Sequence, residues 1–146
     1  MKINILLCCL VLMMLVPSCK MQPQLTEPLT GSLSSSRWQL VRIDTAGGSI
    51  LLNQADTVLL RFNDDQSISG ESHGLCRNTY FGIYSISTAN SIRVDSLVST
   101  EMACTNSRYW HYHSLLGKVR ECQRTSLQLR LYGDQRSQVL VFRPVQ

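Results

Sequence analysis

The chain begins with a nearly continuous apolar stretch and later changes to short runs in which apolar and polar residues alternate. Residues 3–16 are apolar apart from Asn4, and Lys2 precedes them. A membrane-spanning helix needs roughly 20 such residues, so this stretch is short for a span and has the length of a signal-peptide core. The alternation starts at Arg37 and predicts a folded β-rich region.

Alternating hydrophobicity predicts short strands along most of the remaining chain. Val58, Leu60 and Phe62 share one face, and Leu127, Leu129 and Leu131 are expected to point inward. The strands are expected over 38–43, 57–62, 67–71, 80–86, 91–97, 126–132 and 138–142, and Glu121-Cys122-Gln123 begins a further one.

Two turns and one longer loop connect these strands. Asp64-Asp65 predicts one turn, and Gly133-Asp134 predicts another because glycine permits a positive φ. Residues 44–56, which include Gly47-Gly48, are interpreted as a loop.

One segment has the period of a helix. Tyr109, Tyr112, Leu116 and Val119 recur at spacings of three and four, which places them on one helical face. Asn106 or Ser107 can cap its start, and Gly117 is expected near its end. The predicted fold is mainly β, a small antiparallel sheet or partly open barrel of about seven or eight strands with one helix packed on it.

Composition fits one globular domain that follows an export signal. The chain has 146 residues with 44% hydrophobic residues and a formal net charge of +4, which excludes wholesale disorder. The basic residues after Thr105 are spaced along predicted strands, so we interpret them as a solvated face. Export also argues against a nucleic-acid partner.

The signal stretch ends at Val16-Pro17-Ser18-Cys19, which resembles a bacterial lipobox. The resemblance implies that the Cys19 thiol is acylated, for example with palmitate, and that residues 1–18 are removed. Acyl chains anchor a protein through buried CH₂ groups. Lys20 then favours the outer membrane, facing the periplasm. An ordinary signal peptide with an incidental cysteine is the alternative.

Residues 19–36 contain two prolines, many hydroxyl groups and no hydrophobic period. Such composition is typical of a flexible spacer. We therefore expect three parts: a lipoprotein signal peptide at 1–18, a lipid-anchored tether at 19–36, and one domain at 37–146.

Three stretches of this domain resemble the META/HslJ family of small bacterial envelope domains. They are Trp38-Gln39-Leu40, Gly70 with the run from Gly74 to Tyr84, and the run from Ser99 to Cys104, although Arg77 separates Cys76 from Asn78 where the family joins Cys and Asn. The residues that match the family motifs are Trp38, Gly74, Asn78, Tyr80, Gly82, Tyr84, Thr100, Met102 and Ala103.

The resemblance implies a compact β-rich domain, often secreted or lipid-anchored, in a family associated with stress tolerance and antibiotic resistance. No catalytic activity is established for that family as a class. Cys76 and Cys104 occupy two family motif positions, and an oxidising compartment permits a disulfide between them. Two buried free thiols are the alternative. Cys122 is expected to be a buried small hydrophobe.

Candidate chemistry is sparse. His73 lies near Cys76 and could act as a base for a cysteine nucleophile, but no acyl-transfer pattern surrounds the pair. His73, Cys76, Cys104 and His111 could meet at a metal, yet no metal-ligand spacing is present. We therefore expect no catalytic residue, no metal and no cofactor.

The aromatic residues suggest a division between core and surface. Tyr80 and Tyr84 share strand parity and are expected in the core, while Trp110 lies off the helical apolar face and is a candidate for an exposed contact. The sequence thus predicts a non-enzymatic envelope lipoprotein that supports envelope integrity or stress tolerance through a protein partner. The alternative is a periplasmic module that binds a small molecule or a metal.

Overall fold

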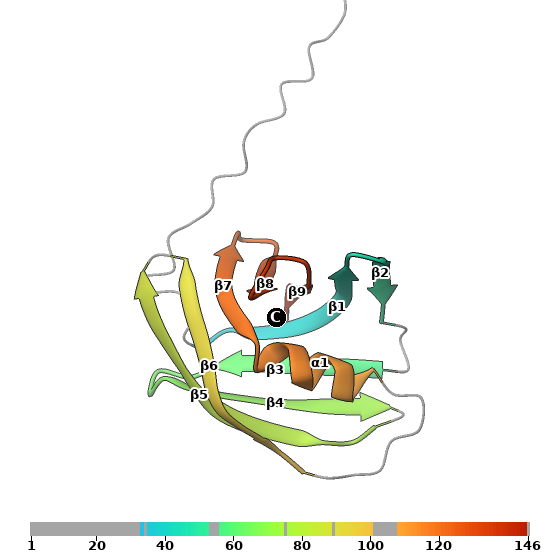
Figure 1. Cartoon of the computed structure of the whole chain (residues 1–146). Coiled ribbons are helices and arrows are strands. Elements are labelled where there is room, and N and C mark those ends of the chain that lie inside the picture. The colour runs from blue at the N-terminus through green and yellow to red at the C-terminus, as the bar shows by residue number, and fades with distance from the viewer. Residues whose placement is uncertain are drawn as a thin grey trace, which may run out of the picture.

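The computed structural model describes residues 33, 35–52, 56–74, 76–88, 90–100 and 108–145. These residues form antiparallel strands and a short helix (Figure 1). None of their helices has the length and apolarity needed to cross a membrane. The elements are β1 (Arg37–Thr45), β2 (Gly48–Leu51), β3 (Asp56–Phe62), β4 (Ser67–Gly74), β5 (Thr79–Thr88), β6 (Ser91–Ser99), α1 (Tyr109–Leu116), β7 (Val119–Arg124), β8 (Leu129–Gly133) and β9 (Val139–Val145).

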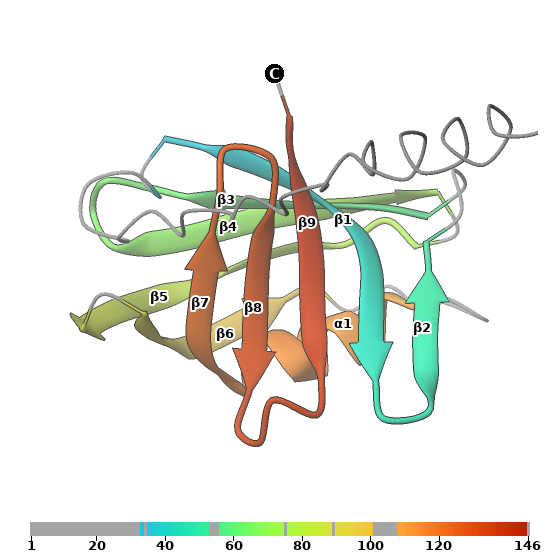
Figure 2. The same ribbon diagram turned by 90° about the horizontal axis from the view of Figure 1, so that it is seen from above.

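The strands close into an antiparallel barrel. The sheet order is β2-β1-β3-β4-β5-β6-β7-β8-β9, and β1 also pairs with β9, so eight strands form a ring and β2 extends it from β1 (Figure 2). Only the pair Ser91 and Glu121 joins β6 to β7 in register, which leaves that seam partly open. The prediction of a mainly β, partly open barrel with one helix is confirmed.

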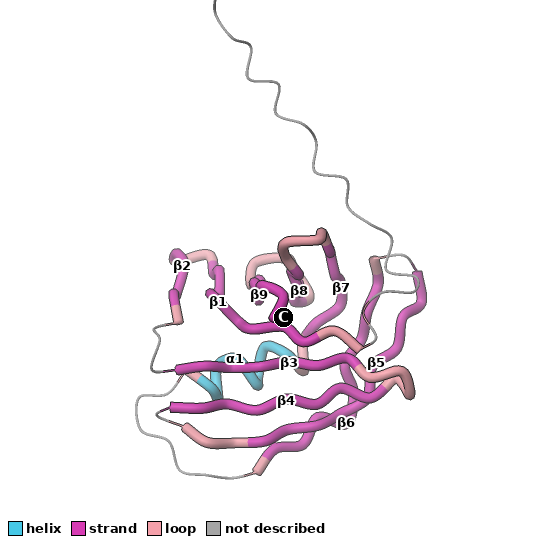
Figure 3. Tube along the Cα trace, turned by 180° about the vertical axis from the view of Figure 1, so that it is seen from behind, coloured by secondary structure: helices cyan, strands magenta, loops and turns pink. Residues whose placement is uncertain are grey.

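A bend in β1 divides the barrel into two curved sheets. The register shifts between Leu40 and Arg42, so β1 pairs with β3 through residues 37–39 and with β2 through residues 42–45. We call β3–β6 the lower sheet and β7, β8, β9, β1 and β2 the upper sheet, as oriented in Figure 1. Helix α1 lies between them (Figure 3).

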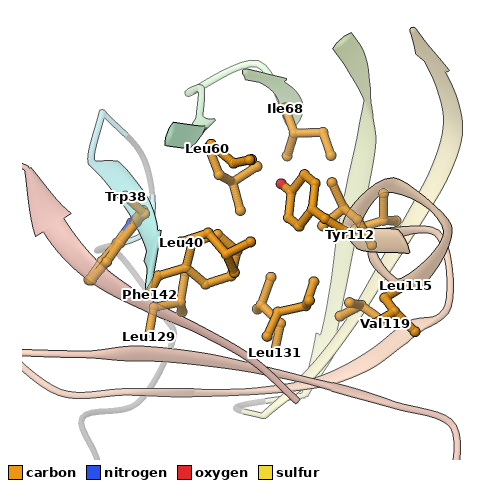
Figure 4. Packing of buried hydrophobic residues seen from close by; sticks show 14 of the residues in the cluster. Trp38, Leu40, Leu60, Ile68, Tyr112, Leu115, Val119, Leu129, Leu131 and Phe142 are labelled. Carbon is orange, nitrogen blue, oxygen red and sulfur yellow. The ribbon is translucent and has the colours of Figure 1, made fainter. Parts of the chain in front are cut away.

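Side chains from both sheets and the helix fill the barrel interior. Tyr112 of α1 points toward Leu60 and Ile68 of the lower sheet, while Leu129, Leu131 and Phe142 line the upper sheet (Figure 4). The predicted inward residues Val58, Leu60 and Phe62 are at most 2% exposed. Each fully buried side chain of this size contributes about 1.5–3 kcal/mol, so the alternation of the strands accounts for the closed core.

The predicted loop over residues 44–56 is partly wrong because it contains the β1–β2 hairpin. Thr45 pairs with Gly48, whose φ of 124° is accessible to glycine and strained for other residues. The Gly47 N–H donates to Thr45 Oγ1 across the turn. The Gly47-Gly48 pair was the available sequence signal for this hairpin.

The helix is shorter than its period suggested. Arg108 is the N-cap residue and makes no side-chain capping bond, while the predicted caps Asn106 and Ser107 lie outside the described residues. Gly117 ends the helix as predicted. Val119 does not belong to the helix: it starts β7, where it is buried at 1% exposure.

The predicted strand over 126–132 begins later, at Leu129. Thr125 Oγ1 accepts hydrogen bonds from the Leu127 and Gln128 N–H groups, which turns the chain. Leu127 is therefore 71% exposed, not inward. Gly133 does precede a turn, but the positive φ falls on Arg136 at 53°.

The folded region includes residues assigned to the tether from sequence. Leu33 is 2% exposed and belongs to the core. The Ser36 hydroxyl donates to Leu33 O and accepts from Trp38 Nε1 at 2.8 Å. Packing against the first core tryptophan thus extends the domain before Arg37.

Candidate functional site

Asn78 is a buried bridge between three segments. At 2% exposure, its side-chain amide donates to Cys76 Sγ at 2.8 Å and its Oδ1 accepts from Thr100 Oγ1 at 3.0 Å. Its backbone N–H donates to Ser72 Oγ at 3.0 Å. Buried polar groups that are fully bonded hold a fold together, so Asn78 has a structural role.

Arg77 is accommodated without displacing either neighbour. Cys76 and Asn78 are both buried while Arg77 is exposed. Ser72 Oγ donates to Cys76 O at 2.9 Å, which fixes the loop before Asn78. The inserted residue therefore points to solvent.

Cys76 is disulfide-bonded and 1% exposed. Its expected partner Cys104 lies outside the described residues, as do the motif residues Met102 and Ala103. The pairing of Cys76 with Cys104 therefore stays a prediction. Cys122 is a free buried cysteine, as expected; burial raises the pKa of its thiol to about 12, so it remains protonated at neutral pH.

Tyr80 of β5 connects β3 of the same lower sheet to the helix. Its hydroxyl donates to Leu59 O at 2.6 Å and accepts from the Tyr112 hydroxyl at 2.6 Å. Burial raises the pKa of both phenols well above the ordinary value. These hydroxyl groups stay protonated and act as structural links.

Gly70 allows this connection. A Cβ there would lie 2.2 Å from Leu59 O and 2.2 Å from the Tyr80 ring. Gly70 and Tyr80 are register partners on β4 and β5, so the absent side chain lets the Tyr80 ring cross β4 and reach β3. The glycine is a packing requirement.

The other described motif residues also support the fold. Tyr84 packs edge-on against Phe62 at 5.1 Å between ring centroids, and its hydroxyl donates to Asn63 O. A Cβ on Gly82 would lie 3.0 Å from Asp95 O, beside the irregular pairing of β5 with β6. Gly74 ends β4 with a φ of 101°.

The described candidate metal ligands form no metal-binding group. His73 is exposed and lies 3.4 Å from a Glu71 carboxylate oxygen, while His111 is exposed on α1. Within the described part of the chain, no three His, Cys, Asp or Glu side chains form a metal-binding group. Cys104, the fourth candidate, lies outside that part.

Two surface features of the described residues are candidates for binding. The first is an open hollow of about 480 Å³ on the outer face of the lower sheet and the adjoining end of β1, and Arg37, Arg61, Glu71, Thr79 and Phe81 are among its lining residues. The second is Trp110, which is 39% exposed on α1 as the sequence predicted.

Sequence reasoning missed the hollow. The side chains that line it, such as Arg61, Ser69 and Phe81, occupy outward positions of their strands. At such positions the sequence pattern predicts only exposure to solvent. The available signal was Phe81 and Ile83, which are apolar at outward positions of β5 and are 62% and 52% exposed.

The comparisons with known proteins agree with this architecture. The META domain family matches residues 31–146. A crystal structure of a DUF4847 family protein from Bacteroides vulgatus has a similar fold, with a TM-score of 0.56 and 12% identity over 77% of this chain and 94% of that chain. A comparison with curated proteins gives no match. Because the family match extends over most of the sequence, the chain belongs to the META domain family.

Proposed function

We propose that this META domain protein is a non-enzymatic lipoprotein of the bacterial envelope, anchored through Cys19, that contacts a protein partner through Trp110. The anchor is supported by the apolar stretch that ends at Val16-Pro17-Ser18-Cys19. Lys20 supports the outer membrane as its location, facing the periplasm. The proposed role is to maintain the envelope under stress.

The exposure of Trp110 carries the proposal for a partner. Its helix neighbours Tyr109 and Tyr112 are at most 1% exposed, yet Trp110 is 39% exposed. The Tyr109 and His113 rings meet it edge-on at 5.2 and 6.0 Å between centroids. A tryptophan held in place loses little side-chain entropy on binding and is a frequent interface hot spot.

The filled interior favours a surface contact over a ligand inside the barrel. Small-molecule sites are concave and take the ligand into a cavity. Here large side chains such as Trp38, Tyr80 and Phe142, each at most 2% exposed, occupy the interior. Binding through the exterior is therefore the simpler use of this fold.

The partner is tested by site-specific photo-cross-linking in intact cells. A photoreactive phenylalanine analogue replaces Trp110 in one variant and Leu51 in a matched control, since Leu51 is 72% exposed on β2. We expect one reproducible envelope protein attached at position 110 and absent at position 51. Equal capture at both positions, or none, contradicts the proposed contact.

The anchor is tested separately. Cys19→Ala removes the acylated thiol, so we expect the chain to move from the membrane fraction to a soluble one and to lose a metabolically incorporated palmitate label. Retention of both in Cys19→Ala contradicts lipidation at Cys19. Ser18 remains unchanged in this variant, which keeps the residue before the cleavage point.

A further inference from the structure

A row of outward side chains crosses the barrel from β1 through the lower sheet. Register pairs join neighbouring strands along it, so the residues lie side by side on one face. Two cationic side chains come first, a small one follows, and two apolar ones end the row. In strand order they are Arg37, Arg61, Ser69, Phe81 and Val98.

The middle of this row is hollow because Ser69 there is small. Its short side chain leaves space on the outer face of β4, and Leu59 and Phe81 provide apolar walls. Phe81 is 62% exposed and Val98 46% exposed. Large apolar side chains gathered on an exposed surface indicate a contact.

The two arginines at one end of the row carry positive charge that is accessible from solvent. The Arg37 guanidinium reaches Glu71 only at 3.5 Å, and both side chains are largely solvated. Arg61 is exposed and forms no ion pair with the described residues. Arginine binds phosphate oxygens with two parallel N–H donors, so this end suits a phosphate group while the other end suits an apolar phase.

Acidic groups near the row limit the attraction. Asp95 on β6 is paired with Arg93 at 2.8 Å. Asp64 accepts a hydrogen bond from the Ser35 hydroxyl at 3.4 Å, and Asp65 is bonded to Ser67, but these neutral donors leave both carboxylates negatively charged. Glu71 lies between Arg37 and His73, which leaves Arg61 as the free cation of the row among the described residues.

The chain enters the domain beside this row. Ser35 N–H donates to Phe62 O at 2.9 Å, and Phe62 is adjacent to Arg61. Residues 20–32 separate the buried Leu33 from Cys19, and a spacer of that length spans roughly 20 Å. A lipid on Cys19 would therefore keep the row within reach of the bilayer.

We propose that the row of Arg37, Arg61, Ser69, Phe81 and Val98 rests on the phospholipid surface, with arginines on headgroup phosphates and Phe81 in the interfacial region. This rests on the proposed anchor at Cys19. Interfacial binding combines buried apolar area with attraction to anionic lipids. It orients the domain so that α1 and Trp110 remain available to a protein partner.

Tryptophan quenching by brominated lipid tests this contact. The chain from Lys20 onward, which contains every described element, is held through an N-terminal hexahistidine tag on vesicles of phosphatidylethanolamine and phosphatidylglycerol with a nickel-chelating lipid. This tether replaces Cys19 acylation, so the result does not depend on the proposed anchor. Phe81→Trp and the control Leu51→Trp are each made in a Trp110→Phe background.

We expect brominated acyl chains to quench Trp at position 81 about twofold, because interfacial side chains lie at the boundary of the acyl region. Position 51 should keep its emission. Adding Arg61→Gln should reduce the quenching at position 81 and weaken its dependence on phosphatidylglycerol. Equal emission changes at positions 81 and 51 would overturn the proposal, while the lipoprotein assignment would still stand or fall with Cys19→Ala.

Discussion

The outer faces of the two sheets differ in the side chains that they expose to solvent. On the upper sheet, arginines are matched by neighbours: Arg120 pairs with Asp134 at 3.1 Å, and Arg136 pairs with Glu121. Arg143 donates to Gln39 Oε1 at 2.8 Å. On the lower sheet, Phe81, Ile83 and Val98 are exposed instead.

The exposed apolar side chains of the lower sheet have no role in packing the barrel core. The inner faces of both sheets are equally closed, since Leu60, Phe62, Leu129 and Leu131 have no exposed surface. Single exposed apolar residues are common, but adjacent ones mark contact surfaces. Under our proposal, the lower sheet is the face that contacts lipid.

The largest expected effect tests the packing role of Gly70 beneath the Tyr80 ring. Gly70→Ala places a Cβ 2.2 Å from Leu59 O and the Tyr80 ring, so we expect a loss of more than about 4 kcal/mol in the free energy of unfolding, or no folded protein. Chemical denaturation measures it. Gly47→Ala is the control, because its nearest neighbour lies at 3.8 Å; equal stability of the two variants would refute the packing role.

The next effect compares an inward residue of the upper sheet with an exposed residue of the turn before β8. Leu129 has no exposed surface, so Leu129→Ala should lower the free energy of unfolding by about 2–5 kcal/mol. Leu127, at 71% exposure, should change it by less than about 0.5 kcal/mol in Leu127→Ala. Thermal and urea unfolding measure the stability of both variants. Similar losses of stability would contradict the exposed position of Leu127.

A smaller effect tests the connection of the lower sheet to helix α1 through Tyr80. Tyr80→Phe removes the donor to Leu59 O and the acceptor for Tyr112, at a cost of about 1–3 kcal/mol. Tyr112→Phe removes only its bond to Tyr80 and should cost about 1 kcal/mol. If Tyr112→Phe proves the more harmful in urea unfolding, the larger share assigned to Tyr80 in these bonds is wrong.

The smallest effect concerns how stability depends on pH through His113, which lies on α1 near Trp110. Burial lowers the pKa of His113 below 6.5 in the folded state, so the unfolded chain binds a proton first as pH falls. Stability contributed by neutral His113 is full above pH 6.5 and declines from there toward the folded pKa. His113→Gln should flatten that part of the pH profile of Tm.

An unaltered profile in His113→Gln would show that the ring does not titrate differently on folding. The Tyr80, Tyr109 and Trp110 rings surround it within about 6 Å, so a protonated imidazole would lie among aromatic faces and edges rather than in water.

Sequence alone was sufficient for most strands because their inward residues alternate. Val58, Leu60 and Phe62 on β3 are the clearest case. It failed at Leu127 because Thr125 turns the chain there through its hydroxyl, which interrupts an otherwise regular pattern. The assignment of Val119 to the helix was also wrong. The helix ends at Gly117, and Val119 is buried as the first residue of β7.

The candidate site was harder to predict because it depends on register between distant strands. Arg61 and Phe81 are unremarkable in sequence and become neighbours of Ser69 only when β3, β4 and β5 pair. The role of Gly70 likewise depends on the Tyr80 ring that crosses it. Exposure of Trp110, by contrast, followed from its position off the helical apolar face.

The central claim is that the two candidate surfaces face different partners. One measurement tests it directly: the photoreactive phenylalanine analogue is placed at position 81 or position 110 in intact cells, and the adducts are identified by mass spectrometry. The account predicts phospholipid adducts at position 81 and one envelope protein at position 110. A protein captured at position 81, with lipid or nothing at position 110, would contradict it.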